Sequence, residues 1–146
     1  MTKQIITSTI NLLKEGPALF TGGTGVIRGK FGAKTVAKSP ACIVMPDFGL
    51  PFNMKDDGIE DAGYNKKPEL LATLYICGIA KTSQEEAEDY VTDLFESVHE
   101  RMLTNIEIIR GDHTENKLWE LNDIQWIERV QTGCVLAVEY KTKLWF

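Results

Sequence analysis

The sequence predicts an α+β fold, in which a mostly antiparallel sheet carries two helices on one face and closes with a C-terminal β-hairpin. Three stretches carry this prediction: helical periodicity at 83–102, an apolar run at 70–80, and strict alternation at 134–146. Each helix must bury an apolar stripe, and one face of the sheet can accept both. With 146 residues and 43% hydrophobic content, the chain suits a single domain, 1–146, with one core.

The first segment, from about Thr2 to Glu15, is predicted to be a short amphipathic helix. Ile6, Ile10 and Leu13 recur at the spacing of one helical face. Gly16-Pro17 then ends the helix, since proline cannot continue its hydrogen-bond ladder.

Two strands are predicted after this helix. Residues 26–31 have modest strand character, because Gly29 weakens it. Residues 41–45 form a better strand between Pro40 and Pro46. The glycine-rich stretch 21–25 matches neither phosphate-binding fingerprint, since a strand rather than a helix follows it, and we interpret it as a flexible connector.

The irregular part of the chain runs from 47 to 68 and combines apolar with acidic residues. The apolar residues of this loop are predicted to contact a partner; the alternative is a solvated loop whose aromatic side chains fold back onto the core. The acidic spacing lacks the ligand pattern of a calcium-binding loop. The apolar set is Phe48, Leu50, Phe52 and Met54, and the acidic set is Asp56, Asp57, Glu60 and Asp61.

The middle of the chain contains the strongest local patterns. Residues 70–80, LLATLYICGIA, predict a strand that is buried on both faces. Ser83 and Glu86 then form a capping box, which predicts the start of a helix. Apolar residues at spacings of three and four, from Ala87 to Met102, give that helix one wide apolar stripe.

The C-terminal hairpin is predicted from two strands, 124–130 and 134–146, joined by a short turn that contains glycine. In the first strand, Ile124, Trp126 and Val130 are predicted to share a face. In the second strand the even positions are mostly apolar and several odd positions are charged, which predicts one buried and one solvated face.

No residue pattern indicates catalysis, and we predict no catalytic residue, cofactor or metal site. Cys42, Cys77 and Cys134 have no disulfide or metal-ligand spacing, and are predicted to be buried hydrophobic residues in a reducing compartment. His99 and His113 are interpreted as a helix-end cation and a turn residue.

The net charge of −5 disfavours a dedicated nucleic-acid binder, which normally presents a basic face. No apolar run approaches the roughly 18 to 20 residues needed to span a bilayer. The first sixteen residues are not predicted to be a signal peptide, because polar residues interrupt their apolar ones.

Over most of its length the chain resembles the tail terminator and tail-to-head joining proteins of long-tailed bacteriophages. The resemblance lies in the helix at 5–13, the strand LLATLYICGIA, the helix SQEEAEDYVTDLFESVHERM and the two closing strands. It implies a structural virion protein of the tail, assembled in the host cytoplasm without a membrane, and not an enzyme. Such proteins form a ring, typically a homohexamer, that caps the tail tube protein, stops its polymerisation and presents a surface to the head connector protein. DNA passes through the lumen without specific binding.

For this chain the resemblance implies subunits joined heterologously around a closed axis. The apolar residues of the 47–68 loop would contact a neighbouring subunit or ring, and its acidic residues would stay exposed, facing the channel. Two alternatives stay open. One is another phage or injection-system morphogenesis protein, such as a head-completion protein or a tube subunit, the latter expected to carry a long two-stranded segment for its neighbour. The other is a small-molecule-binding or enzymatic α+β domain, expected to have a pocket of convergent polar groups.

Overall fold

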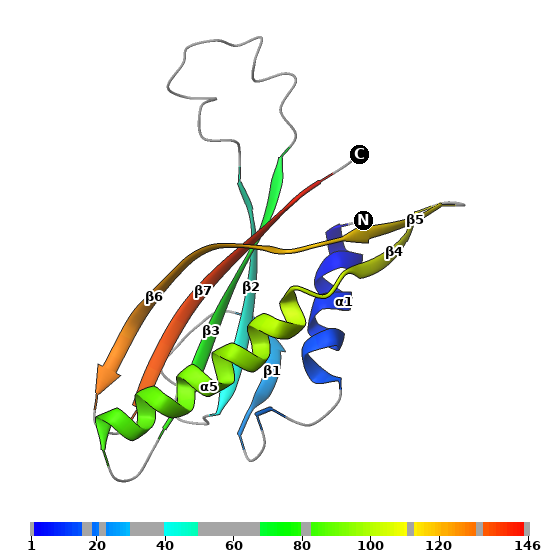
Figure 1. The fold of residues 1–146 in the computed structure, drawn as a ribbon. Helices are drawn as coiled ribbons and strands as arrows, with labels where there is room; N and C mark the ends of the chain where they lie inside the picture. Colours follow the sequence, from blue (N-terminus) through cyan, green and yellow to red (C-terminus); the bar gives the residue numbers. More distant parts are fainter. Residues whose placement is uncertain are drawn as a thin grey trace, which may run out of the picture.

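The computed structural model confirms the α+β fold class (Figure 1). It describes residues 2–15, 19–20, 23–29, 40–49, 68–79, 83–110, 113–130 and 133–144. The helices are α1 (Thr2–Lys14) and α5 (Gln84–Met102), and the strands are β1 (Gly25–Arg28), β2 (Ala41–Gly49), β3 (Glu69–Gly78), β4 (Ile106–Arg110), β5 (His113–Lys117), β6 (Glu120–Val130) and β7 (Gly133–Lys143).

Five of these strands form one sheet in the order β1-β2-β3-β7-β6. β1 runs parallel to β2, and every other pair in the sheet is antiparallel. The predicted closing hairpin is the β6–β7 pair, so the last strand of the chain lies inside the sheet and β6 lies at its edge. β4 and β5 form a separate two-stranded sheet, here called the arm, which extends past α1 (Figure 1).

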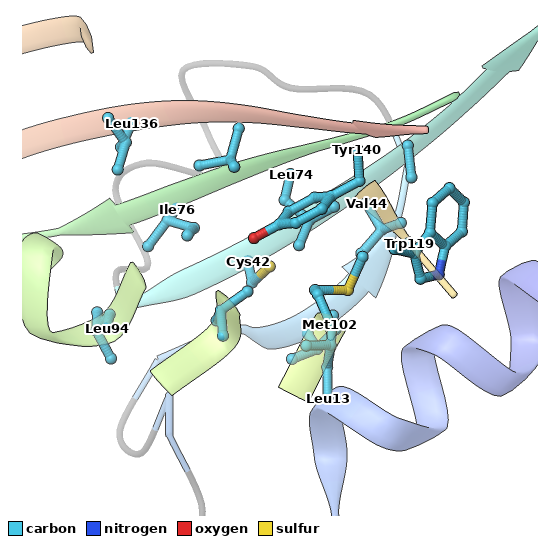
Figure 2. Packing of buried hydrophobic residues seen from close by; sticks show 14 of the residues in the cluster. Leu13, Cys42, Val44, Leu74, Ile76, Leu94, Met102, Trp119, Leu136 and Tyr140 are labelled. Atoms are coloured by element: carbon cyan, nitrogen blue, oxygen red, sulfur yellow. The ribbon is translucent and has the colours of Figure 1, made fainter. Parts of the chain in front are cut away.

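Both helices cover the same face of the sheet, here called the helix face (Figure 1). The main core lies between the two helices and the helix face of the sheet. Figure 2 shows Tyr140 and Leu74 from the sheet packing near Met102 and Leu13 from the helices. The opposite face is here called the outer face. It carries a smaller buried cluster, whose fully buried members are Ala41, Ile43, Cys77 and Val135.

α1 is held by polar contacts as well as by its buried apolar residues. The Thr9 hydroxyl donates to the carbonyl of Ile5 at 2.7 Å and accepts the indole N–H of Trp119 at 3.0 Å. The guanidinium of Arg101 donates to the carbonyl of Leu13 at 2.7 Å, at the end of the helix where carbonyls lack intrahelical partners. These contacts join α1 to α5 and to the residue that precedes β6.

The capped helix is confirmed. The hydroxyl of Ser83 accepts the backbone N–H of Glu86 at 3.1 Å, and acidic residues occupy the first turn of α5. Its buried stripe matches the predicted period and consists of Ala87, Val91, Leu94, Val98 and Met102.

Three details of the strand predictions were wrong. β2 does not stop before Pro46 but continues to Gly49, because residues 45–49 pair with 69–73 of β3. The 106–117 segment was not predicted as strand, yet it forms the arm. The outer face of β7 is not uniformly solvated, since Val135 and Ala137 are buried there.

The predicted common face of Ile124, Trp126 and Val130 was also wrong for the last residue. Ile124 and Trp126 pair with Val138 and Leu136 and therefore lie on the helix face. A β-bulge between Trp126 and Glu128 adds one residue, which moves Val130 to the outer face.

Gly78 is predicted to be needed for the close approach of α5 to β3. A Cβ at this position would lie 2.8 Å from side-chain carbons of both Tyr90 and Val91. We expect Gly78→Ala to lower the free energy of unfolding by about 1–3 kcal/mol, as overpacked cores do, measured by urea denaturation. The control is Gly29→Ala, whose Cβ would meet no atom within 4 Å. Equal stability of the Gly78 variant and the control would contradict this packing.

Candidate functional site

The described residues contain no side-chain cluster typical of a metal site. No group of three or more His, Cys, Asp or Glu side chains within them could hold a metal ion. Cys42, Cys77 and Cys134 are buried and free, as predicted. Burial raises the pKa of the Cys77 thiol to about 11 and also raises the pKa values of the other two, so these thiols are poor nucleophiles.

His99 has a contact that the sequence did not reveal. Its Nδ1 lies 2.8 Å from the hydroxyl of Tyr140, and its ring stacks between those of Phe95 and Tyr140. The interpretation as a simple helix-end cation is therefore incomplete, because the ring is half-buried between α5 and β7. Phe95 and His99 are one helical turn apart, but Tyr140 is 41 residues away, so nothing local in the sequence indicates the pair.

A polar hollow of about 470 Å³ lies where β7 ends, beside the junction of the arm with β6. Lys141 faces Glu120 across the sheet, and Lys143 faces Glu69, so opposite charges alternate along its rim. The arm adds an internal ion pair, in which Lys117 Nζ lies 3.1 Å from Glu115 Oε2. Charges that balance in this way give little attraction for either an anion or a cation.

The sheet ends in β1 on one side and in β6 on the other, and the outer side of β6 is here called the open edge. Among the described strands β6 pairs only with β7, and ten of its eleven residues are exposed. Isolated exposed apolar residues are ordinary, but here they occur along one edge strand, and edge strands are common sites of strand addition. The exposed large apolar residues of this edge are Leu121, Ile124, Ile127 and Val130.

Half-buried Trp126 connects the open edge to the core. Its ring packs against the main core cluster, and the guanidinium of Arg129 lies 5.8 Å from the ring centroid. Leu121 and Ile124 share the helix face with Trp126, since their partners Tyr140 and Val138 point under the helices. An apolar strip therefore continues from the core to the open edge.

The arm also exposes a large apolar residue, Ile109, close to its tip. Ile106 and Ile108 are buried, whereas the side chain of Ile109 is 68% exposed. Alternation along β4 places Ile109 on the opposite side from Ile106 and Ile108, away from the core.

Of the residues predicted to contact a partner or to face the channel, the structure describes only Phe48. Phe48 lies on β2, beside Leu70 of β3, with 62% of its side chain exposed, which fits a partner contact better than packing on the core. The remaining predicted residues, Leu50, Phe52, Met54, Asp56, Asp57, Glu60 and Asp61, lie outside the described residues. His113 falls in β5 rather than in a turn.

Comparison with known proteins gives no family assignment. No protein-family model matches the chain, and no curated protein is significantly similar to it. Neither described helix is both long and apolar enough to cross a membrane.

Replacing Tyr140 with Phe is predicted to remove about 1 kcal/mol of stability at neutral pH, because His99 loses its hydrogen-bond partner. Burial raises the pKa of Tyr140, so the folded state retains a proton that the unfolded chain releases above pH of about 10. The wild type should therefore lose stability as the pH rises beyond that point, and the variant should lose less.

Urea denaturation under reducing conditions at pH values of about 8 and 10.5 measures both effects. Tyr90→Phe is the control, since that side chain is on the exposed flank of α5. An identical loss of stability at high pH in the wild type and Tyr140→Phe would contradict the prediction.

Proposed function

We propose that this chain is a self-assembling structural subunit with the role of a tail terminator. In this role it forms a ring on the end of a tail tube, prevents further addition of tube subunits and offers the head connector a surface. The observation that carries the proposal is the pair of exposed apolar features at different places on one sheet, namely Phe48 on β2 and the open edge on β6.

Two different contact surfaces on one chain are what a closed ring needs. In a heterologous contact, one surface of a subunit meets a different surface of the next, and a suitable rotation closes the ring. Phe48 and the open edge lie on non-adjacent strands, separated by β3 and β7, so one neighbour on each side can be accommodated. Large exposed apolar side chains are typical anchors of such contacts.

The charge of the chain fits a channel that DNA crosses without being held. The net charge is −5, and this total includes the acidic residues of the 47–68 loop. Like charge on the lumen and on the phosphate backbone limits attachment of the DNA as it passes.

A tube subunit is a second candidate, and the arm favours it. The expectation for a tube subunit was a two-stranded segment that reaches a neighbour, and the arm is a hairpin with an exposed Ile109. Its strands have five residues each, which is short for a segment that must pair with the next ring. A small-molecule-binding or enzymatic domain has less support, because the polar hollow carries alternating charges instead of converging groups.

Phe48→Asp is predicted to prevent ring formation while leaving the subunit folded. The side chain is 62% exposed, so a carboxylate there meets water in the free chain but would be desolvated in a subunit contact. Phe48→Leu is the matched control, which keeps an apolar anchor. Native mass spectrometry and negative-stain microscopy, with isolated tail tubes added, should show rings of about six chains for the wild type and the control only. Rings formed equally well by Phe48→Asp would remove Phe48 from the interface, and the absence of any ring on tubes would contradict the terminator role.

A further inference from the structure

The open edge retains a backbone group directed away from the sheet. The N–H of Ile124 donates to the carboxylate of its own neighbour Asp123 at 2.9 Å. A backbone N–H that bonds to a preceding side chain is not used in the ladder with β7, which places this amide on the open side of β6. By alternation, Gln125 directs its backbone groups towards β7 and Trp126 directs its own outwards.

Two β-bulges define the part of β6 that can accept another strand. The register with β7 shifts between Leu121 and Asp123 and again between Trp126 and Glu128. Bulges twist an edge and discourage pairing, so they protect the two ends of β6. The regular window between them runs from Asp123 to Trp126.

A second copy of β6 matches this window in an antiparallel register centred on Gln125. Antiparallel self-pairing must keep residues of the same face opposite each other. With the two-fold axis at Gln125, Ile124 faces Trp126 of the partner subunit, and both belong to the helix face. Leu121 and Arg129 of the partner subunit, also on the helix face, become opposite as well.

Charges that flank the regular window, beyond the two bulges, favour this register over the alternative centred on Ile124. A centre at Ile124 would also preserve the faces, but it sets Glu120 opposite Glu128 of the partner subunit, twice in the symmetric pair. Like charges directly opposite destabilise strand pairing. A centre at Gln125 sets Glu120 opposite Val130 of the partner subunit, and no carboxylate faces another.

We propose that β6 pairs with β6 of a second copy of this chain about a two-fold axis at Gln125, forming one continuous ten-stranded sheet. Ile124 and Trp126 of each subunit then extend the apolar core of that subunit across the two-fold axis. Ile124 and Trp126 of the partner subunit exchange backbone hydrogen bonds, and the amide of Ile124 leaves the Asp123 carboxylate. This two-fold contact uses the same open edge as the heterologous contact of the proposed ring. It therefore describes the free chain before ring assembly, and it goes beyond the proposed function.

Cysteine cross-linking tests this register directly. Gln125 is the one residue that faces itself, in a non-hydrogen-bonded pair where side chains approach most closely. Gln125→Cys should give a disulfide-linked dimer under mild oxidation. Asp123→Cys, two residues away on the same face, should give far less of the disulfide-linked dimer. In this register residue 123 faces Ile127 of the partner subunit, so the two introduced cysteines are not opposite each other. The native cysteines are all buried and do not compete.

Ile124→Glu provides the second measurement. It should weaken the dimer at least about tenfold by sedimentation equilibrium, since it sets a carboxylate against Trp126 of the partner subunit. Leu103→Glu is the matched control, with 48% of its side chain exposed against 42% for Ile124, and it lies at the end of α5. Circular dichroism checks that both variants fold.

A cross-link at 125 together with weakening by Ile124→Glu supports the proposal. A chain that stays monomeric at about 200 μM overturns it, as does a dimer that cross-links equally at 123 and 125. Rings without a cross-link at 125 would overturn this contact and leave the proposed function intact. A cross-linked dimer that never forms rings on tubes would support this contact and contradict the proposed function.

Discussion

The pairing of β7 with two neighbours is the constraint on which the rest of the structure depends. β7 joins β3 along ten residues on one side and β6 on the other, and the even positions of β7 supply the floor of the main core. α5 packs on this floor, and α1 is then fixed to α5 through Arg101 and to the residue before β6 through Trp119. Each of these contacts depends on the register of β7.

The same arrangement explains why one edge of the sheet is left open. α5 packs on β3 and β7 (Figure 1), whereas the large apolar residues Leu121, Ile124, Ile127 and Val130 of β6 remain exposed. β6 therefore has one side in the ladder and one side in solvent, with apolar residues that the folded monomer does not use fully. The bulges restrict this edge to a short regular window. An edge of this kind favours a specific contact over indiscriminate strand addition.

The sequence predicted the elements whose information is local. The N-cap at Ser83 and the period of α5 depend on residues within one or two turns, and both were confirmed. The alternation of β7 predicted its buried face. The extent of β2 was not predicted, because its pairing with β3 overrides the local preference of Pro46 for a turn.

The remaining features arise from pairing between distant segments. The bulges in β6 depend on its register against β7, so the orientation of Val130 could not be inferred from a two-residue period. The contact between His99 and Tyr140 joins α5 to β7, and three other strands lie between these two elements along the chain. Of the predicted partner contacts, Phe48 is exposed as expected, while the exposed strand β6 emerges only from the topology.

We propose that the molecule acts through self-association and not through chemistry on a substrate. Sedimentation velocity of the full chain, from about 1 to 200 μM, measures this most directly. We expect the weight-average mass to rise from that of one chain to that of two or more as concentration increases. A mass that remains that of a single chain throughout this range, with tail tubes present as well as absent, would contradict the account.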